Sequence, residues 1–440
     1  MDLAEAEHFL TSSETVECCF PDTWGVLTGR RLPKARFLAA ARDGLSMPNA
    51  PFAWDIDGHI EPLPYANPET GFPNMFVVPD LSTLRSAPWA ESTAFCLMDA
   101  YERPGGEPNP LASRAILRRA IGRLADVGYR AWVAPELEFY LCTEDWEPIY
   151  PDRRNWSMTL GAEYEPVLGE LRLALLGCGV PVESSQTEYG PGQMEVNVGP
   201  SSALDAADNA TILKYVVKVV ARKHGLRATF MPMPFQEGSG SGHHLHLSLR
   251  SNGSEQNAFA GDDLPDGEVR NAAMRWTLAG VLDHMVELTA VNLPSVNAYK
   301  RLFDYTFAPN RVTWALDNRT TAVRIPPEEG DARRLEIRTA SSDANPYLIL
   351  AGALASAADG LANRLEPPAA TKGDAYRDTA ATRLPLTLSR AVDAFEGSTF
   401  CKDVFGEVFV ETFSILARNE EQAFLRHVTD WERARYLAPS

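Results

Sequence analysis

Carboxylates and imidazoles recur in four short, strand-like runs in the middle of the chain. The runs are Ala134–Phe139, Glu188–Glu195, Gly240–His246 and Arg334–Arg338. Oxygen ligands joined by one or two imidazoles suit Mg²⁺ or Mn²⁺. Because a strand alternates its faces, the two carboxylates at residues 136 and 138 point the same way, as do the imidazoles at residues 244 and 246. The last run places Arg334, Glu336 and Arg338 on one face too, so the pattern predicts a divalent-metal centre beside cations, as phosphate chemistry needs.

Arginines gather around the last of these runs. Five of them, counting Arg333, fall between residues 319 and 338, and Arg301 precedes them. A guanidinium binds carboxylate or phosphate through paired hydrogen bonds, whereas a single surface ion pair contributes little. The cluster therefore indicates an anionic ligand or several partner carboxylates. The chain has no GxGxxG stretch and no Walker-type glycine–lysine loop, so a nucleotide would be held by metals and arginines.

Each run also has an ordinary explanation. Residues 136–138 could lie on the exposed face of a half-buried strand, and residues 188–195 could form a hairpin with a charged surface. The stretch from Gly238 to His246 is more specific, because three of the eight histidines directly follow a glycine-rich turn that lets backbone approach a ligand. His243 faces away from its neighbours and is expected to be structural.

The elements that must position these runs follow from hydrophobic periodicity. Residues 1 to about 100 predict a small β-rich unit with strands at Val16–Phe20, Gly25–Leu32, Ala53–Ile60 and Met75–Val78, and a linker follows at Arg103–Pro110. Beyond it the texture becomes mixed. Helices are predicted at Leu111–Val127, Ala203–Lys223, Glu268–Leu288, Pro346–Asn363 and Val404–Tyr436, and strands at Tyr129–Cys142, Met194–Val198, Ala228–Met233, His243–Leu249 and Arg334–Thr339. This is an α+β pattern with helices packed behind an antiparallel sheet.

Composition narrows the class of protein. With 440 residues, 45% of them hydrophobic, the chain can build a large core, and two domains are expected. A formal net charge of −18 argues against nucleic acid as a partner. We find no signal peptide and no apolar run long enough to cross a membrane. Six cysteines without metal spacing are typical of reduced thiols, which predicts a cytoplasmic protein.

These motifs, in this order, resemble the glutamine synthetase superfamily. Further matching segments are Gly25–Pro33, Asn345–Tyr347 and His427–Arg433, so the resemblance covers nearly the whole chain. It implies an N-terminal β-grasp domain, residues 1–105, and a large catalytic domain, residues 106–440. It also implies a homo-oligomer, often a dodecamer of two hexameric rings, with active sites between neighbouring subunits.

The resemblance assigns roles to individual residues. One metal site would use Glu138, Glu188 and Glu195, and the other Glu136, His244 and Glu336. The ATP side would comprise Glu183, His246, Ser248, Arg324 and Arg334. The glutamate substrate would be held by Gly240, Arg301 and Arg338, with Arg319 and Arg324 around the transferring phosphate. With two or more Mg²⁺ or Mn²⁺ ions and ATP as co-substrate, such enzymes convert the γ-carboxylate of glutamate to an acyl phosphate, from which an amine then displaces phosphate.

Departures from the family pattern fall on the amine side. The family holds ammonium with an Asp from the neighbouring β-grasp domain and a Glu in the flap that follows the substrate arginine. The matching positions here are Asn74 and Phe307, while Asp304 in the same flap could supply a replacement charge. A cation needs negative charge nearby, whereas an aromatic ring favours an amine with an apolar part. Ser239 also replaces the usual Asn beside the glutamate substrate.

The predicted function is therefore a γ-glutamyl amide ligase that uses a primary amine, either a polyamine or an alkyl or aromatic amine. The γ-glutamylpolyamine synthetase branch is the most similar in type. Two alternatives stay open. One is an ordinary ammonia-using glutamine synthetase with a rebuilt ammonium site, and the other is a catalytically silent sensor that binds glutamate or nucleotide.

Overall fold

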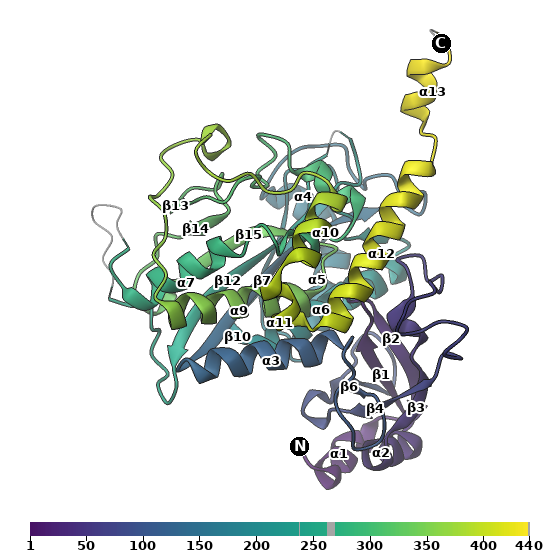
Figure 1. The fold of residues 1–440 in the computed structure, drawn as a ribbon. Coiled ribbons are helices and arrows are strands. Elements are labelled where there is room, and N and C mark those ends of the chain that lie inside the picture. The colour runs from purple at the N-terminus through teal and green to yellow at the C-terminus, as the bar shows by residue number, and fades with distance from the viewer. Residues whose placement is uncertain (237, 262–268, 439–440) are drawn as a thin grey trace.

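The computed structural model describes residues 1–236, 238–261 and 269–438 and has two β-sheets with helices packed around them (Figure 1). The predicted α+β class is confirmed. Among the described residues, none of the helices combines the length and the apolar character that a membrane span requires.

The first sheet is built by the N-terminal part of the chain. Its strand order is β2 (Leu27–Pro33), β1 (Thr15–Pro21), β6 (Thr93–Tyr101), β4 (Asn74–Pro79) and β3 (Leu45–Pro48), with β5 (Arg85–Ser86) beside β6. β1 and β6 run parallel and the other pairs are antiparallel. Helices α1 (Leu3–Phe9) and α2 (Lys34–Asp43) complete this unit.

Three of the four strands predicted in this region are confirmed, and the strand predicted at Ala53–Ile60 is wrong. A 3-10 helix ends at residue 53, and a tight turn follows. The turn forms because the side chain of Asp55 accepts hydrogen bonds from the backbone N–H groups of Asp57 and His59, at 2.9 and 2.8 Å. The central strand β6 was not predicted.

The second sheet is larger and carries the predicted motifs. Its order is β13 (Trp314–Leu316), β14 (Val323–Ile325), β15 (Leu335–Ser341), β12 (Gly242–Ser251), β7 (Tyr129–Cys142), β9 (Gln193–Val198) and β8 (Val182–Thr187). The short strands β10 (Ser201–Ser202) and β11 (Arg227–Thr229) also pair with β7. All pairs are antiparallel except β13 with β14. Each of the five strands predicted in this region overlaps an observed strand.

Helices cover the second sheet, and in Figure 1 α3, α7 and α9 lie across one of its faces. The helices beyond the first unit are α3 (Ser113–Asp126), α4 (Met158–Glu163), α5 (Glu165–Gly177), α6 (Ala203–Lys223), α7 (Ala272–Asp283), α8 (Thr289–Asn292), α9 (Pro346–Asn363), α10 (Leu388–Gly397), α11 (Thr399–Phe405), α12 (Glu407–Arg426) and α13 (Asp430–Tyr436). α7 and α9 approach closely at two glycines. A Cβ on Gly280 would lie 2.1 Å from the carbonyl oxygen of Ser356, so only glycine permits this packing.

Most of the predicted helices are confirmed, and two need comment. The helix predicted to begin at Glu268 is α7, although Glu268 itself lies outside the described residues. The single helix predicted over Val404–Tyr436 is wrong, because the chain forms three. Gly406 has a positive φ of 91° that ends α11, and Thr429 starts α13 with a capping box.

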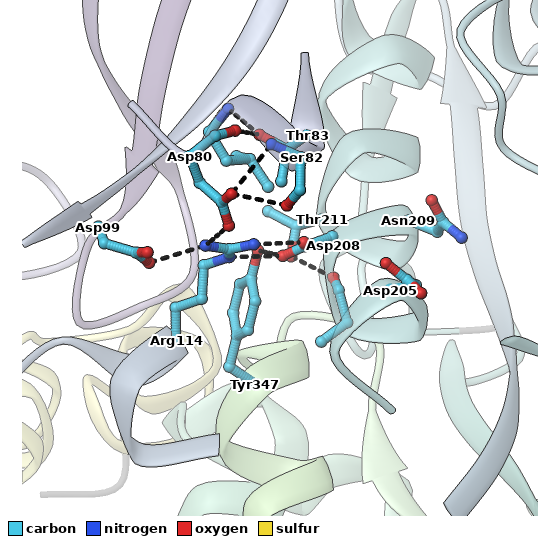
Figure 2. Close-up of polar contacts among 12 residues, drawn as sticks. Asp80, Ser82, Thr83, Asp99, Arg114, Asp205, Asp208, Asn209, Thr211 and Tyr347 are labelled. Atoms are coloured by element: carbon cyan, nitrogen blue, oxygen red, sulfur yellow. Dashed lines mark hydrogen bonds and ion pairs between the residues drawn. The ribbon is translucent and has the colours of Figure 1, made fainter. Parts of the chain in front are cut away.

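A buried ion network joins the two sheet units (Figure 2). Arg114, from α3, is 2% exposed and lies between the two units. Its guanidinium contacts Asp80 at 2.9 Å and Asp99 at 2.7 Å in the N-terminal unit, and Asp208 of α6 at 2.8 Å. The hydroxyl of Tyr347 donates to Asp208 at 2.7 Å. The carboxylates outweigh burial and raise the pKa of Arg114, so its charge fixes the orientation of the N-terminal unit.

Candidate active site

A cleft of about 990 Å³ lies over one face of the second sheet. Every residue given a role in the sequence analysis lines it, except Asn74 and Asp304. The lining includes Glu136, Glu138, Glu183, Glu188, Glu195, Gly240, His244, His246, Ser248, Arg301, Phe307, Arg319, Arg324, Arg334, Glu336 and Arg338. Strands β7, β8, β9, β12, β14 and β15 carry most of them, so the sheet register decides the geometry of the site.

The alternation of β7 separates core from cleft. Leu137 and Phe139 point into an apolar cluster with α5 and α6, whereas the side chains of Glu136 and Glu138 point into the cleft. Across the strand pairing, Glu138 stands opposite Glu195 of β9. A purely exposed strand face, the ordinary explanation for Glu136 and Glu138, therefore does not apply, because both carboxylates lie inside a concave site.

Three carboxylates form an open cluster. Ligand oxygens of Glu138, Glu188 and Glu195 all lie within 4.8 Å of one another. Burial, followed by the charge of neighbouring carboxylates, raises the pKa of Glu188 to about 7 and of Glu195 to about 10. Burial also raises the pKa of Glu138. Like charges held together out of water are costly unless a cation lies among them, so this donor set fits a hard divalent ion.

The second predicted group of ligands is also brought together, but its atoms hydrogen-bond to one another. His244 Nδ1 lies 2.6 Å from Glu136 and 4.0 Å from Glu336. His246 Nε2 lies 3.2 Å from Glu136. Burial would raise the pKa of Glu136, yet the hydrogen bonds from the two imidazoles outweigh it and hold that pKa well below its ordinary value. A cation could join this group only by displacing these mutual contacts.

Arginines crowd around Glu336 at the same end of the cleft. Arg338 and Arg324 both pair with it, the latter at 2.6 Å. Although burial acts against ionisation, the charge of Arg338, followed by those of His244 and His246, lowers the pKa of Glu336 to about 2. Arg334 Nε donates to Nδ1 of His246 at 3.1 Å, and Arg319 is exposed at the rim.

Two buried guanidinium groups have free donors. Within the described part of the chain, Nε of Arg301 and Nε of Arg338 have no hydrogen-bond partner, although these residues are only 3% and 5% exposed. Arg301 also passes so close to Gly240 that a Cβ there would lie 2.6 Å from its Cγ. Unpaired buried N–H groups facing a cleft favour an anionic ligand such as a carboxylate.

Aromatic side chains line the cleft. Phe307 has a φ of 59°, is 57% exposed, and its carbonyl accepts a hydrogen bond from Arg338 at 3.3 Å. Trp156 and Tyr189, neither of them predicted, line the same cleft. A side-chain hydrogen bond from Trp156 reaches Glu188. The cleft therefore holds aromatic side chains as well as carboxylates, and Trp156 contacts the carboxylate cluster directly.

Two residues predicted for the amine side do not line the cleft of the same chain. Asp304 accepts a hydrogen bond from Asn310 at 2.7 Å and is absent from the residues that line the cleft. Asn74 begins β4 in the first sheet and does not line the cleft of its own chain either. The resemblance placed this residue in a neighbouring subunit's site, a relation that a single chain does not test.

Uncharged polar residues were missed because their type alone carries no signal. Asn197 donates to Glu136 at 3.2 Å and Gln186 to Glu195 at 2.5 Å. Gln193 contacts Glu138 at 3.3 Å. All three occupy cleft-facing positions in β8 or β9, and the position of Gln193 inside the run Glu188–Glu195 was the one available hint.

Known proteins are similar to nearly the whole chain. A model described as the glutamine synthetase catalytic domain matches residues 110–436. A glutamate–isopropylamine ligase from a Pseudomonas species is 35% identical, covering 96% of this chain and 95% of that protein. A gamma-glutamylethanolamide synthetase from Streptomyces coelicolor is 35% identical (96% and 92% covered), and a glutamine synthetase from Thermotoga maritima is 33% identical (95% and 95%). The solved structure of a GmaS–ADP complex superposes with a TM-score of 0.87 at 29% identity, covering 99% of both chains.

Proposed function

The chain belongs to the glutamine synthetase family, and on this premise we propose that it is an ATP-dependent ligase that joins the γ-carboxylate of glutamate to an organic primary amine. The observation that carries the proposal is that three aromatic residues, Phe307, Trp156 and Tyr189, line the same cleft as the carboxylate cluster. A ring offers an organic amine an apolar surface but gives ammonium no compensating charge. Relatives whose names specify isopropylamine as the amine, or an ethanolamide as the product, support the same choice.

The reaction has two steps in which every atom is accounted for. An oxygen of the glutamate γ-carboxylate attacks the γ-phosphorus of ATP, the bond to the β-phosphate oxygen breaks, and ADP leaves. The amine nitrogen then attacks the acyl carbon of the γ-glutamyl phosphate. Phosphate departs, and the nitrogen loses a proton to give the amide. Negative charge gathers on oxygens in both steps, so cations must be in place beforehand.

The arginines supply part of that charge. Arg301 and Arg338, with their unpaired Nε–H groups, are suited to hold the carboxylates of glutamate. Arg319 and Arg324 would act on the transferring phosphate. Glu183, His246, Ser248 and Arg334 line the part of the cleft that we propose for ATP. Gly240 would present backbone to the substrate, since no side chain fits there.

Divalent ions complete the charge balance. We propose that Glu138, Glu188 and Glu195 hold one Mg²⁺ or Mn²⁺, and that Glu136, His244 and Glu336 hold another. Such ions neutralise phosphate oxygens and favour attack at phosphorus. Glu188 is the residue we assign to both the metal and the amine side, because it contacts Trp156 as well as the carboxylate cluster.

Within the class of amines, we favour a monoamine with an apolar part over a polyamine. The second ammonium of a polyamine would need a carboxylate near the aromatic residues that line the cleft. Asp304, the candidate for that role, is hydrogen-bonded to Asn310 and does not line the cleft. The intact set of carboxylates and arginines argues against a silent sensor, which would have no physical need for all of them.

We further propose a homo-oligomer, a ring or a pair of rings, in which Asn74 of one subunit reaches the amine side of its neighbour. The C-terminal segment supports assembly. α13 has no buried residue, extends beyond the body of the subunit (Figure 1), and exposes Trp431, Tyr436 and Leu437. We also propose residues 1–105 and 106–440 as the β-grasp and catalytic domains, and a cytoplasmic location, where ATP is supplied.

An amine panel tests the function. Purified protein is incubated with glutamate, ATP, Mg²⁺ and one amine at a time, and ADP release and the mass of the product are followed. Turnover with an organic amine above that with ammonium supports the proposal. ATP binding by calorimetry without phosphate release for any amine would instead favour the sensor.

A further inference from the structure

The loop that carries Gly240 is held in place by two buried side chains of the second sheet. This loop, residues 238–242, leads into β12 and passes directly over Arg301. The two side chains belong to Tyr140 of β7 and Gln193 of β9, which stand opposite each other in the sheet register. Both point to the same face as Glu138, two residues away from Tyr140.

Tyr140 binds the backbone of one residue, Ser239, through both functions of its hydroxyl. Its Oη accepts a hydrogen bond from the N–H of Ser239 at 2.9 Å and donates one to the carbonyl of Ser239 at 2.7 Å. The side chain is fully buried, with its ring edge-on to Phe235 at 5.3 Å. A Cβ on Gly238 would lie 2.8 Å from this oxygen, so the loop and the hydroxyl fit each other closely.

Gln193 connects the same loop to the carboxylate cluster. Its Nε2 lies 3.3 Å from Glu138 Oε2 and 3.2 Å from the carbonyl oxygen of Gly240. Its Oε1 accepts a hydrogen bond from the N–H of Gly190 at 2.9 Å, in the turn that follows Glu188. The N–H of Gly242 also donates to Glu138 Oε2, at 2.7 Å. One buried amide thus contacts a cluster carboxylate, the Gly240 loop and the turn beside Glu188.

We propose that Tyr140 and Gln193 are positioning residues. They fix the Gly240 loop, residues 238–242, relative to the carboxylates that we assign to metal binding. This inference rests on the proposed function of the cleft. Tyr140 sets where the loop lies, and Gln193 makes that position depend on the orientation of Glu138. Neither side chain needs to touch ATP, so both should act on glutamate rather than on nucleotide.

The test compares Tyr140→Phe and Gln193→Met with wild type, using any amine that gives turnover. Tyr140→Phe removes only the hydroxyl and takes this partner from the backbone N–H and carbonyl of Ser239. We expect the KM for glutamate to rise about tenfold, with the KM for ATP and the Mn²⁺ affinity unchanged. Gln193→Met should raise the KM for glutamate and also weaken Mn²⁺ binding, measured by calorimetry without substrates. Tyr164→Phe is the matched control, because its hydroxyl also donates to a backbone carbonyl, that of Ile149, at 2.6 Å.

Several outcomes would overturn the inference. One is a KM for glutamate in Tyr140→Phe equal to that of the control, and another is an equal rise in the KM for ATP. If Tyr140→Phe does not fold, Gln193→Asn, which shortens the amide by one carbon, provides the test, and an unchanged KM for glutamate refutes the coupling. If wild type turns over no amine, the proposed function fails, and Mn²⁺ binding by Gln193→Met still decides whether the amide supports the cluster.

Discussion

Without metal, the carboxylate cluster should lower the free energy of unfolding relative to a variant that lacks one of the three carboxylates. Ligand oxygens of Glu138, Glu188 and Glu195 lie within 4.8 Å of one another. Burial, followed by the charges of Glu136 and then of these two neighbours, raises the pKa of Glu195 from 4.5 to about 10. Replacing Glu195 with Gln keeps the shape and the oxygen that accepts from Gln186 but removes the titrating group. We therefore expect Glu195→Gln to stabilise the metal-free protein and to weaken its stabilisation by metal.

The size of the effect follows from proton linkage. Above pH 4.5 an unfolded Glu195 releases its proton, while the folded protein retains it up to about pH 10. The cost of folding therefore grows as pH rises from 4.5, by about 1.36 kcal/mol for each unit. At pH 7.5 this amounts to roughly 4 kcal/mol. The substitution should recover most of that amount at pH 7.5 and almost nothing near pH 4.5.

Thermal midpoints measured with and without Mn²⁺ test both parts of the prediction. Mn²⁺ at about a hundred times its Kd should stabilise wild type by about 2.7 kcal/mol, and Glu195→Gln by much less. Glu255→Gln, at an exposed residue that pairs with Arg130, is the control and should show neither effect. A variant that melts below wild type without metal at pH 7.5, or that retains the full Mn²⁺ response, would refute the reasoning.

Three further predictions concern the preference for organic amines over ammonium, the ion network between the two sheet units, and the pH dependence of stability. Phe307→Glu should raise ammonium use relative to organic amines by at least about tenfold, since a carboxylate within about 6 Å of a cation contributes more than 1.4 kcal/mol at an effective dielectric near 20. Phe303→Glu, at an exposed flap position outside the cleft lining, should leave the ratio of the two ADP-release rates unchanged. Arg114→Met leaves buried carboxylates unbalanced and should cost about 3–5 kcal/mol, far more than Arg118→Met at a half-exposed site; equal thermal midpoints for the two variants would contradict this. Burial lowers the pKa of His284, but flanking carboxylates outweigh it and raise the pKa above 6.5, so the stabilisation is present below pH 6.5 and lost as pH rises through the folded value. The difference in midpoint between wild type and His284→Gln should therefore narrow from pH 6 to pH 9, and a constant difference would exclude the ion pairs as its source.

Elements with strong periodicity could be predicted from the sequence. The bounds of β7, α6 and α9 agree with the predicted ranges at both ends, because each is long and its apolar spacing is continuous. The failures have local causes. Asp55 folds a turn from its own side chain where alternation predicted a strand, and Gly406 interrupts a helical pattern through its backbone conformation alone.

Some residues of the candidate site could likewise be predicted from the sequence, and others could not. Charged residues such as Glu188 and Arg338 stand out in a sequence because burial of a charge needs a reason. Trp156 and Gln193 do not, since an aromatic ring or an amide is common in any core or surface. Their positions depend on which strands and loops meet, and that is set by sheet register and tertiary packing. Likewise, the hydrogen bond that holds Asp304 away from the cleft depends on flap geometry rather than on residue type.

The most direct test of the central claim is the amine preference of the wild-type protein. ADP release and product mass are measured with saturating glutamate, ATP and Mg²⁺ across ammonium, short alkyl monoamines, an aromatic amine and a diamine. We predict a γ-glutamyl amide of an organic monoamine, formed with a kcat/KM above that for ammonium. Glutamine formation with a micromolar KM for ammonium, faster than reaction with every organic amine, would contradict the account.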